Sequence, residues 1–410
     1  MTSKRLSSVP ASPIRKLVPY AVAAKKAGVT VYHLNIGDPD IKTPEVMLDV
    51  LHNWKDNPIR YGQSQGEPGF LDAVLSYYHT LGFPFLNTEQ LQVTSGGSEA
   101  IAMAMFAVTD PGEEILTFEP LYTNYNSYAA MNGITLTAVA TDIKTGFHLP
   151  LQQEIEKKIT KNTKAILYCN PNNPTGTVYT KAEVEMLVSI AKKHHLFLLS
   201  DEVYREYCYD GKKQISLFSY MQEIPDLAVV LDSMSKRYSL CGARLGVLVS
   251  LNPEIMAGVL RIAQGRLSAG FVDQAIASKL TEVPDSYLEG VQKEYAKRRD
   301  VLYEGLSKIP GVTIPKPEGA FYTIVGLPVP DAEAFCQWLL TDFRDPSASS
   351  GQAETVMLAP AAGFYTSASL STGATQGKGK NEVRIAYVLN TQALTRCIEI
   401  LKKALQAYRG

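Results

Sequence analysis

The middle of the chain alternates short apolar runs with longer segments in which apolar positions recur every three or four residues. Six of the short runs predict strands, at residues 91–94, 115–118, 165–169, 196–200, 228–233 and 246–250. Amphipathic segments such as residues 181–194 lie between them. This alternation predicts an α/β fold with a mostly parallel sheet between helices. Ligands of such sheets bind at the carboxyl ends of the strands.

The pattern changes after about residue 250. A long helix is predicted over residues 284–307, followed by a smaller α+β lobe over residues 308–410. We expect the N-terminal 45 residues to pack with that lobe. The predicted division is an N-terminal segment at 1–45, a large domain at 46–285 and a small C-terminal domain at 286–410.

Composition narrows the class of protein. Hydrophobic residues make up 45% of the chain, charged residues 20%, and the net charge is −1. This charge gives no basic surface for nucleic acid, and no apolar stretch reaches the roughly 20 residues that span a bilayer. The five cysteines form no C-x-x-C pair, at positions 169, 208, 241, 336 and 397. They favour a reducing compartment and argue against a disulfide scaffold or a metal site.

Reactive side chains directly follow three of the predicted strands. Lys236 comes after 228–233, Asp201 and Tyr204 come after 196–200, and Asn173 comes after 165–169. A lysine at a strand end can hold an aldehyde cofactor as a Schiff base. A buried aspartate there is stabilised by a cation such as a protonated pyridine nitrogen. Each residue alone is more often structural, and their common position at one sheet edge is what indicates a site.

Anion-binding groups occur near the same edge. Gly96-Gly97-Ser98 follows the first predicted strand and opens a helix, whose free N–H groups suit a phosphate. Arg244 precedes another predicted strand and suits a phosphate as well. Arg384 is predicted to begin a strand over 383–389, where a guanidinium can hold an α-carboxylate in a bidentate grip. Residues 367–380, which precede it without periodicity, predict a flexible linker or, alternatively, a mobile flap.

The motifs around these residues resemble those of one family. They are Asn-Pro-Asn-Asn-Pro-Thr-Gly at 170–176, Ser-Asp-Glu-Val-Tyr at 200–204 and Ser-x-Ser-Lys at 233–236. Together with Asn-Ile-Gly-Asp-Pro at 35–39 and Arg-Ile-Ala-Tyr at 384–387, they resemble the class I/II aminotransferases. These are fold type I enzymes that depend on pyridoxal 5′-phosphate. The resemblance implies a large domain with a mostly parallel seven-stranded sheet between helices, and a smaller α+β domain.

The resemblance also implies a role for each matching residue. Lys236 would be the catalytic Schiff-base lysine, which then moves a proton on the substrate. The implied cofactor-binding residues are Gly97, Ser98, Tyr122, Asn173, Asp201, Tyr204, Ser233, Lys236, Arg244 and, reaching a neighbouring subunit, Tyr61. The implied substrate-binding residues are Gly37, Asn173 and Arg384. A homodimer with shared active sites and a cis Asn173–Pro174 bond are expected from the same resemblance.

The sequence indicates the substrate less clearly than it indicates the cofactor. The chain resembles most the bacterial branch that contains many aspartate aminotransferases, so aspartate and 2-oxoglutarate are the leading pair. Some members carry a lysine where this chain has Ser98, and Arg15, Lys16 and Arg266 are candidates to replace it. The alternatives are an aminotransferase for a neutral or aromatic amino acid, or a carbon–sulfur lyase of the same fold. A non-catalytic protein that binds the cofactor is a further alternative, which intact Lys236 and Asp201 disfavour.

The charge of the N-terminal segment bears on the cellular compartment of the protein. Its first 37 residues contain six Lys or Arg and no Asp or Glu, a charge bias that transit peptides share. The family-like sequence starts close to residue 8, which leaves too little sequence for such a peptide, so the cytoplasm is expected.

Overall fold

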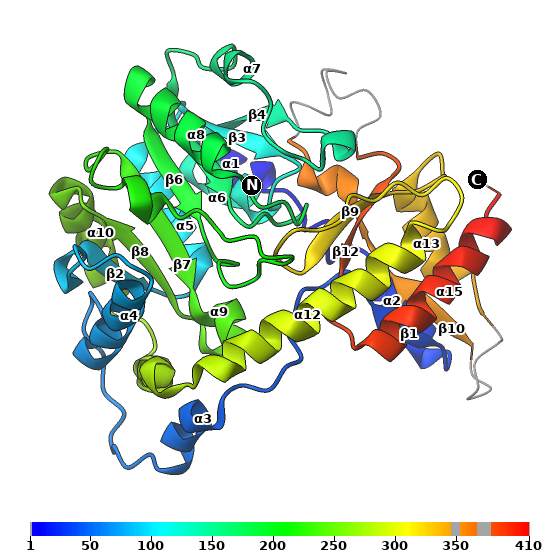
Figure 1. Ribbon diagram of the computed structural model, residues 1–410, viewed down its shortest axis with the longest axis horizontal. Helices are drawn as coiled ribbons and strands as arrows, with labels where there is room; N and C mark the ends of the chain where they lie inside the picture. The colour runs from blue at the N-terminus through cyan, green and yellow to red at the C-terminus, as the bar shows by residue number, and fades with distance from the viewer. Residues whose placement is uncertain (1, 346–352, 367–378, 410) are drawn as a thin grey trace.

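A seven-stranded mixed sheet forms the centre of the larger part of the molecule (Figure 1). The computed structural model describes residues 2–345, 353–366 and 379–409. The strands lie in the order β2 (Leu91–Thr94), β8 (Gly246–Ser250), β7 (Ala228–Ser233), β6 (Phe197–Asp201), β5 (Thr163–Cys169), β3 (Glu114–Glu119) and β4 (Thr135–Ala140). β8 is antiparallel to both neighbours, and the other neighbouring pairs are parallel. The predicted α/β fold is therefore confirmed.

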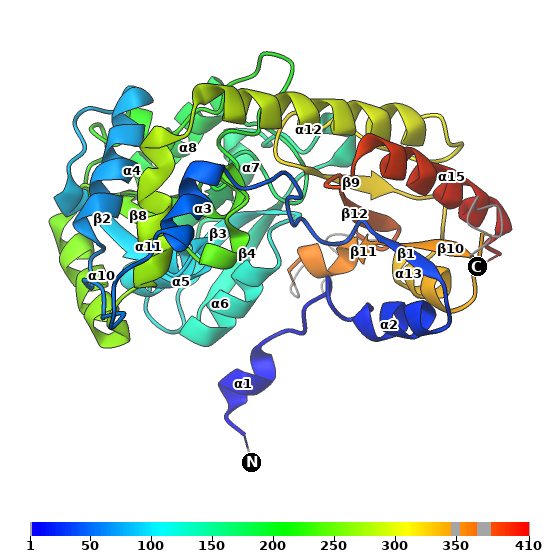
Figure 2. The same ribbon diagram turned by 90° about the horizontal axis from the view of Figure 1, so that it is seen from below.

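Helices cover both faces of this sheet, because alternate residues of a strand point to opposite sides. On β5, Ala165 and Leu167 pack into one helical layer, whereas Ile166 and Tyr168 pack into the other. The first layer contains α5 (Gly97–Val108), α6 (Asn124–Asn132) and α10 (Pro253–Arg266). The second contains α4 (Pro68–Thr80), α8 (Lys181–His194) and α11 (Phe271–Ala277). Figure 2 shows α8 and α5 on opposite sides of the strands. The shorter helices are α3 (Glu45–His52), α7 (Gln152–Glu156) and α9 (Met234–Arg237).

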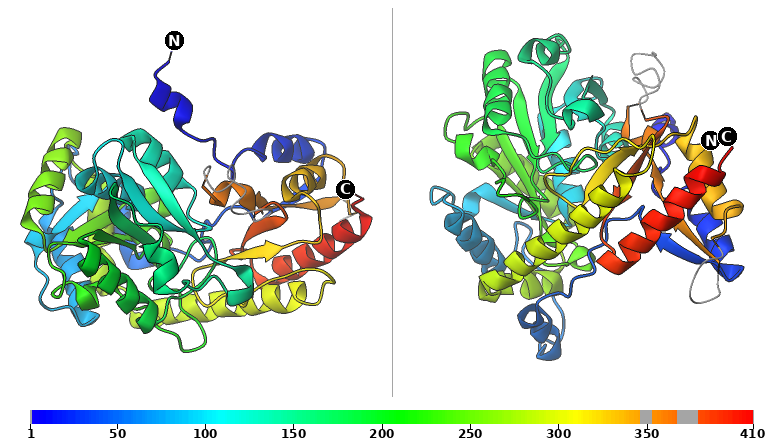
Figure 3. Two further views of the ribbon diagram at one scale, coloured as in Figure 1. Left: turned by 90° about the horizontal axis from the view of Figure 1, so that it is seen from above. Right: turned by 45° about the vertical axis from the view of Figure 1, so that its right-hand side comes forward.

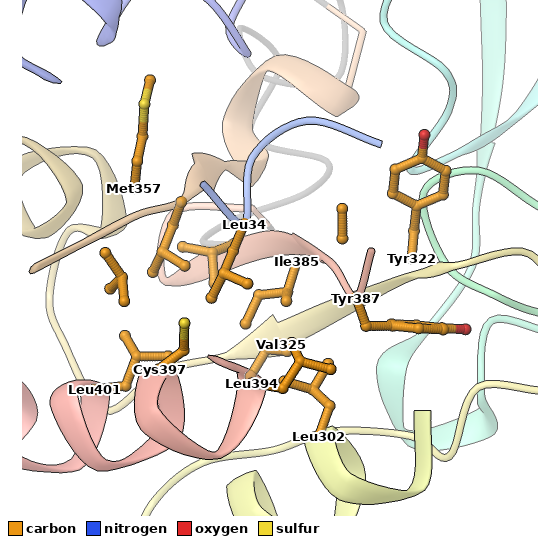
Figure 4. Close-up of a cluster of buried hydrophobic side chains, with 14 of the residues drawn as sticks. Leu34, Leu302, Tyr322, Val325, Met357, Ile385, Tyr387, Leu394, Cys397 and Leu401 are labelled. Carbon is orange, nitrogen blue, oxygen red and sulfur yellow. The ribbon is translucent and has the colours of Figure 1, made fainter. Parts of the chain in front are cut away.

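A second, smaller part lies beside the sheet (Figure 3). Its three-stranded antiparallel sheet has the order β11 (Ala359–Pro360), β12 (Glu382–Ala386) and β9 (Tyr322–Gly326). A parallel pair joins β1 (Thr30–His33) to β10 (Glu354–Met357). Its helices are α2 (Val18–Lys26), α13 (Ala332–Thr341) and α15 (Thr391–Ala407). Their apolar faces enclose a core in which Leu34 from the N-terminal part of the chain meets Ile385 and Leu401 (Figure 4).

The 22-residue helix α12 (Asp285–Leu306) connects the two parts and crosses the molecule diagonally in Figure 1. Its prediction over 284–307 is confirmed to within one residue at each end. Val291, Tyr295 and Leu302 are buried in the core of the smaller part. At the other end of the chain, the short helix α1 (Lys4–Ser8) projects from the molecule (Figure 2). It lies close to α6.

Three features differ from the sequence prediction or lie beyond it. Strand β4 was not predicted, and Arg384 lies at the centre of β12 rather than at its start. The predicted loop at 367–380 falls, apart from its last two residues, outside the described residues.

All five cysteines are free thiols. Among the described residues, every helix is too short or too polar to cross a bilayer.

Candidate active site

Polar side chains from neighbouring strand ends meet in a half-open pocket. β5, β6 and β7 are adjacent and parallel, so their carboxyl ends form one edge of the sheet. The residues of the pocket that the sequence predicted are Gly97, Ser98, Tyr122, Asn173, Asp201, Tyr204, Ser233, Lys236 and Arg244. Ile101, Val203, Ser235 and Cys241 also line it and were not predicted. A concave site in which a few polar side chains converge is typical of a small-molecule site.

The Lys236 amine points into this pocket from α9. Its Nζ donates to the carbonyl oxygen of Gly37 at 2.9 Å and lies 3.3 Å from the Cys241 sulfur. The side chain is partly buried, and among the described residues no carboxylate lies within ion-pairing distance of Nζ. An amine that is fixed by weak partners rather than by a salt bridge can be released to react with a carbonyl carbon.

Asp201 ends β6 and forms the floor of the pocket. Its side chain is 4% exposed, and burial raises the pKa of this carboxyl to about 6. Hydrogen bonds from the Tyr125 hydroxyl, at 2.5 Å, and from the Val203 N–H, at 3.3 Å, oppose that rise. A cationic group placed beside this carboxylate would stabilise its ionised form further. Tyr125 was not predicted; it lies in the first turn of α6, and its ring contacts that of Tyr122, which precedes the helix.

The turn that precedes α5 provides an anion site at the other end of the pocket. Gly96 has φ +82°, a conformation that side chains rarely adopt, and a Cβ there would lie 2.4 Å from Nη2 of Arg244. A Cβ on Gly246, at the start of β8, would lie 2.5 Å from the carbonyl carbon of Gly96. The glycines thus allow the guanidinium and β8 to approach the helix N-terminus, where N–H groups and positive charge favour an anion.

Ser233 and Arg244 are held beside that helix N-terminus by local hydrogen bonds. The Ser233 hydroxyl donates to Leu245 O at 2.9 Å and caps α9 through the Ser235 N–H at 3.1 Å. Arg244 is exposed, with φ +45°, and its Nη1 donates to Cys241 O at 2.9 Å. Its charge is not neutralised by any carboxylate among the described residues, which leaves it available for a bound anion.

Arg384 is the most deeply buried cation of the site, at 2% exposure. Nη1 donates to Asn173 Oδ1 at 3.1 Å and Nη2 to Asn35 O at 2.6 Å, while Nε has no partner among the described residues. The guanidinium lies between the rings of Tyr322 and Phe364, 4.4 and 4.9 Å from their centroids. Burial lowers its pKa, and no carboxylate compensates its charge in the part of the chain described. A buried, unneutralised fork of this kind is suited to a carboxylate ligand.

Gly37 and Tyr61 occupy different positions relative to the pocket. Gly37 lies over it, because its carbonyl oxygen accepts from Lys236 and a Cβ on it would lie 1.8 Å from the Tyr322 hydroxyl oxygen. Tyr61 is 83% exposed and does not line the pocket of its own chain. Tyr322 was not predicted, because its approach to Gly37 joins segments that no sequence pattern relates.

The prediction of a cis bond between Asn173 and Pro174 is wrong. The cis bond of this motif is Asn170–Pro171, and Asn173–Pro174 is trans. The reason is the local turn: Asn172 Oδ1 accepts from the N–H and the hydroxyl of Thr175, at 3.2 and 3.0 Å. These bonds close the turn with a trans peptide, and Asn173 still reaches the pocket.

The three candidate cations for a distal carboxylate have different surroundings. Lys16 forms an ion pair with Glu333. Arg266 donates to Val93 O at 3.0 Å and lies 3.3 Å from a Glu99 oxygen. Arg15 is exposed, and its neighbour Ile14 accepts a hydrogen bond from Asn35 Nδ2 at 3.1 Å. Because Asn35 also contacts Arg384, Arg15 is the candidate whose backbone lies beside the site.

The fold and the pocket together define an α/β enzyme. The family model for aminotransferase class I and II matches residues 29–344, and the chain belongs to this family. It is a transaminase, which exchanges an amino group between an amino acid and a 2-oxo acid, and family membership implies pyridoxal 5′-phosphate as the cofactor.

Relatives of known function are similar over most of the chain. The aspartate aminotransferase of Thermotoga maritima is 32% identical over 83% of this chain and 89% of its own. Its crystal structure superposes with a TM-score of 0.86 and 27% identity, covering 99% of this chain and 100% of that one. A probable aspartate/prephenate aminotransferase of Aquifex aeolicus is 27% identical over 98% of each chain. An alanine aminotransferase of Pyrococcus furiosus has a TM-score of 0.85 and 29% identity over the full length of both.

Proposed function

We propose that this transaminase takes the amino group of L-aspartate and passes it to 2-oxoglutarate in a ping-pong reaction. The observation that carries a role in amino-acid binding is the buried, unneutralised guanidinium of Arg384. Asn173 links this guanidinium to the Tyr204 hydroxyl, because its Oδ1 accepts from Arg384 and its Nδ2 donates to Tyr204. An α-carboxylate bound at Arg384 places the substrate nitrogen on the side of the pocket that contains Lys236.

The donor set fits pyridoxal phosphate. Asp201 offers a carboxylate to the pyridine nitrogen, and the Gly97 helix terminus with Arg244 and Ser233 offers an anion site to the phosphate. Tyr122 offers its ring face to the pyridine ring. When bound, the cofactor supplies an electron sink for the electron pair left on the substrate Cα.

The chain's own residues supply attachment, proton transfer and orientation. Lys236 would hold the cofactor through its aldehyde carbon, and its amine would move a proton to and from the substrate Cα. Asp201 keeps the proton on the pyridine nitrogen, because an ionised carboxylate in this buried position is stabilised by that positive charge. Asn173 and Tyr204 would donate to the phenolic oxygen of the cofactor and favour its ionised form. Gly37 presents backbone to the substrate.

The proposed second carboxylate site uses Arg15. Ser98 provides no cation, and Lys236, Arg244 and Arg384 are assigned to the aldehyde, the phosphate and the α-carboxylate. Lys16 and Arg266 have carboxylate partners already. The second candidate function, transamination of a neutral amino acid such as alanine, is favoured by Ser98 alone.

A half-reaction screen tests the proposed function. The protein loaded with pyridoxal phosphate is mixed with single L-amino acids, and loss of the cofactor's visible absorbance is followed. Aspartate should react at least about tenfold faster than alanine or phenylalanine if a charge contact of over 1.4 kcal/mol is used. Arg15→Ala should remove this preference, and Lys16→Ala is the matched control that should keep it. Equal rates for aspartate and alanine in the wild-type protein would favour the neutral substrate class.

We further propose a homodimer in the cytoplasm. The exposed side chains of Tyr61 (83%) and Ile59 (61%) support the dimer, because large apolar groups at such exposure mark an interaction surface. In this dimer Tyr61 reaches the phosphate of the neighbouring subunit. The division into residues 1–45, 46–285 and 286–410 is likewise our proposal, supported by the pairing of β1 with β10.

A further inference from the structure

Four side chains of the site form a closed ring of contacts. Arg384 donates to Asn173 Oδ1, and Asn173 Nδ2 donates to the Tyr204 hydroxyl oxygen at 3.3 Å. The Tyr204 hydroxyl donates to the Tyr322 hydroxyl oxygen at 3.2 Å. The ring of Tyr322 lies against the Arg384 guanidinium, 4.4 Å from its central carbon, and closes the circuit. Tyr322 therefore touches both the residue assigned to the cofactor's phenolic oxygen and the residue assigned to the substrate.

Tyr322 is fixed in this place. It begins β9 in the smaller part of the molecule and is 3% exposed (Figure 4). A Cβ on Gly37 would lie 1.8 Å from its hydroxyl oxygen and 2.3 Å from the adjoining ring carbon. The ring of Tyr322 also contacts the ring of Tyr204: the two centroids lie 5.7 Å apart, and the ring planes are at 88° to each other. The hydroxyl is therefore directed at Tyr204 by packing on all sides, which is the condition for a precisely oriented hydrogen bond.

The number of protons determines how these two hydroxyls can act. A tyrosine hydroxyl has one proton to donate and two lone pairs to accept. Burial raises the pKa of Tyr204 well above its ordinary value, so Tyr204 stays a neutral donor. In the absence of a cofactor, that single proton can be donated to the Tyr322 hydroxyl oxygen, which lies 3.2 Å away. When it is donated instead to the cofactor's phenolic oxygen, the Tyr322 proton becomes free to bond back to the Tyr204 oxygen.

We propose that Tyr322 is a positioning residue that reverses this hydrogen bond when the cofactor binds. Its hydroxyl then donates to Tyr204, whose oxygen accepts from Tyr322 and Asn173 while its proton goes to the cofactor. Two donors polarise the Tyr204 hydroxyl and strengthen its own donation. A stronger donor favours the ionised phenolic oxygen and lowers the pH at which the bound cofactor changes colour. This inference rests on the proposed function.

The test separates the hydroxyl of Tyr322 from its ring. In Tyr322→Phe, the ring stays against Arg384, and we expect the pH midpoint of the bound cofactor's absorbance to rise by roughly 0.5 unit. The KM for aspartate should stay within about twofold, because the contact with Arg384 is kept. In Tyr322→Leu, KM should rise about tenfold as well, because the aromatic face is lost.

Tyr387→Phe is the matched control. Tyr387 is a fully buried tyrosine of the same part of the molecule, and its hydroxyl donates to the carbonyl oxygens of Gly319 and Ala320 at 3.4 and 3.2 Å. Its loss affects folding without touching Tyr204, so the pH midpoint should not move. An unmoved midpoint in Tyr322→Phe, or an equal shift in Tyr387→Phe, overturns the role of Tyr322. A wild-type protein that shows no visible band with the cofactor overturns the proposed function instead.

Discussion

Asp232 and Arg237 form a bidentate ion pair across the segment that contains Lys236. Both nitrogen–oxygen contacts use Nη2 of Arg237, at 3.0 and 2.8 Å, and both side chains are fully buried. Burial alone would raise the pKa of Asp232, but the guanidinium groups of Arg237 and Arg205 outweigh it and hold that pKa low. Tyr78 donates a further bond to Asp232 at 3.0 Å. The end of β7 is thereby joined to the end of α9, and the turn between them has little freedom.

Asp232→Asn should destabilise the protein by about 3 kcal/mol, because it removes the buried carboxylate that faces both Arg237 and Arg205 and leaves Arg237 with Glu206 alone. Urea unfolding monitored by circular dichroism measures this change. Glu154→Gln breaks the exposed pair between Glu154 and Lys157, which lies at 2.6 Å, and should change stability by less than about 0.5 kcal/mol. Equal effects of the two substitutions would show that the buried pair does not brace the turn.

Lys236→Ala should abolish both turnover and the visible absorbance of a protein–cofactor adduct, because no other lysine of the described residues lines the pocket. Spectra recorded after addition of pyridoxal phosphate check this outcome. Lys16→Ala, which removes an amine outside the pocket, should keep the band. Turnover at the wild-type rate in Lys236→Ala would contradict the assignment of the nucleophile.

Arg384→Ala should raise KM for every amino donor by about 100-fold, the loss expected for a buried charge-assisted contact. Steady-state kinetics with several donors measure the effect. Arg384→Lys keeps the charge without the planar fork and should give an intermediate KM. An effect confined to aspartate would instead assign Arg384 to the distal carboxylate.

Gly37→Ala should disable the site, because its new Cβ meets the Tyr322 hydroxyl at 1.8 Å and Tyr322 must move. We expect kcat to fall about tenfold or more, as catalytic groups are displaced by about 1 Å. Gly290→Ala is the control: it lies exposed in α12, with no atom within 4 Å of the new Cβ. It should leave kcat unchanged and raise stability by up to about 1 kcal/mol.

His148 makes stability depend on pH in the alkaline range. Hydrogen bonds to Glu183, at 3.0 Å, and then the contact with Glu318, at 3.5 Å, raise the pKa of His148 to about 9 from its ordinary 6.5. The folded protein therefore binds this proton more tightly than the unfolded chain does. The stabilisation is complete below about pH 6.5 and is lost as the pH rises through about 9.

His148→Gln measures that contribution. The free energy of unfolding of the wild-type protein should exceed that of the variant by about 1–2 kcal/mol at pH 6, and this difference should shrink at pH 9.5. Glu154→Gln, which removes an exposed ion pair that contains no histidine, is the control. A wild-type advantage that is constant from pH 6 to 9.5 would exclude proton binding by His148 as its source.

Local sequence patterns were sufficient to predict a helix or strand where a single segment determines its own structure. Residues 181–194 form α8 as predicted, since Thr180 and Glu183 make a capping box at its start and Lys192 and Lys193 favour its end. β4 was missed because it lies at the sheet edge and its exposed and half-buried residues interrupt the apolar run. Arg384 was predicted to begin a strand over 383–389, yet β12 also includes Glu382, which is buried and accepts a hydrogen bond from Tyr365 at 2.7 Å.

The strand-end side chains could be grouped from the sequence because parallel strands align their carboxyl ends. Tyr322 and Cys241 could not be, for two different reasons. Tyr322 reaches the site through the packing of the smaller part of the molecule onto the larger. Cys241 lies five residues after Lys236, and only the turn after α9 brings its sulfur within 3.3 Å of Nζ.

The contact between Gly246 and Gly96 limits how the anion site can be altered. A side chain at 246 would displace the backbone of the turn itself, whereas a side chain at 96 would displace the Arg244 guanidinium. Both positions therefore belong to one unit, although 150 residues separate them in the sequence. Directed evolution toward a new substrate can vary the pocket near Ser98 and Arg15, but a library that varies either glycine will consist mostly of inactive clones.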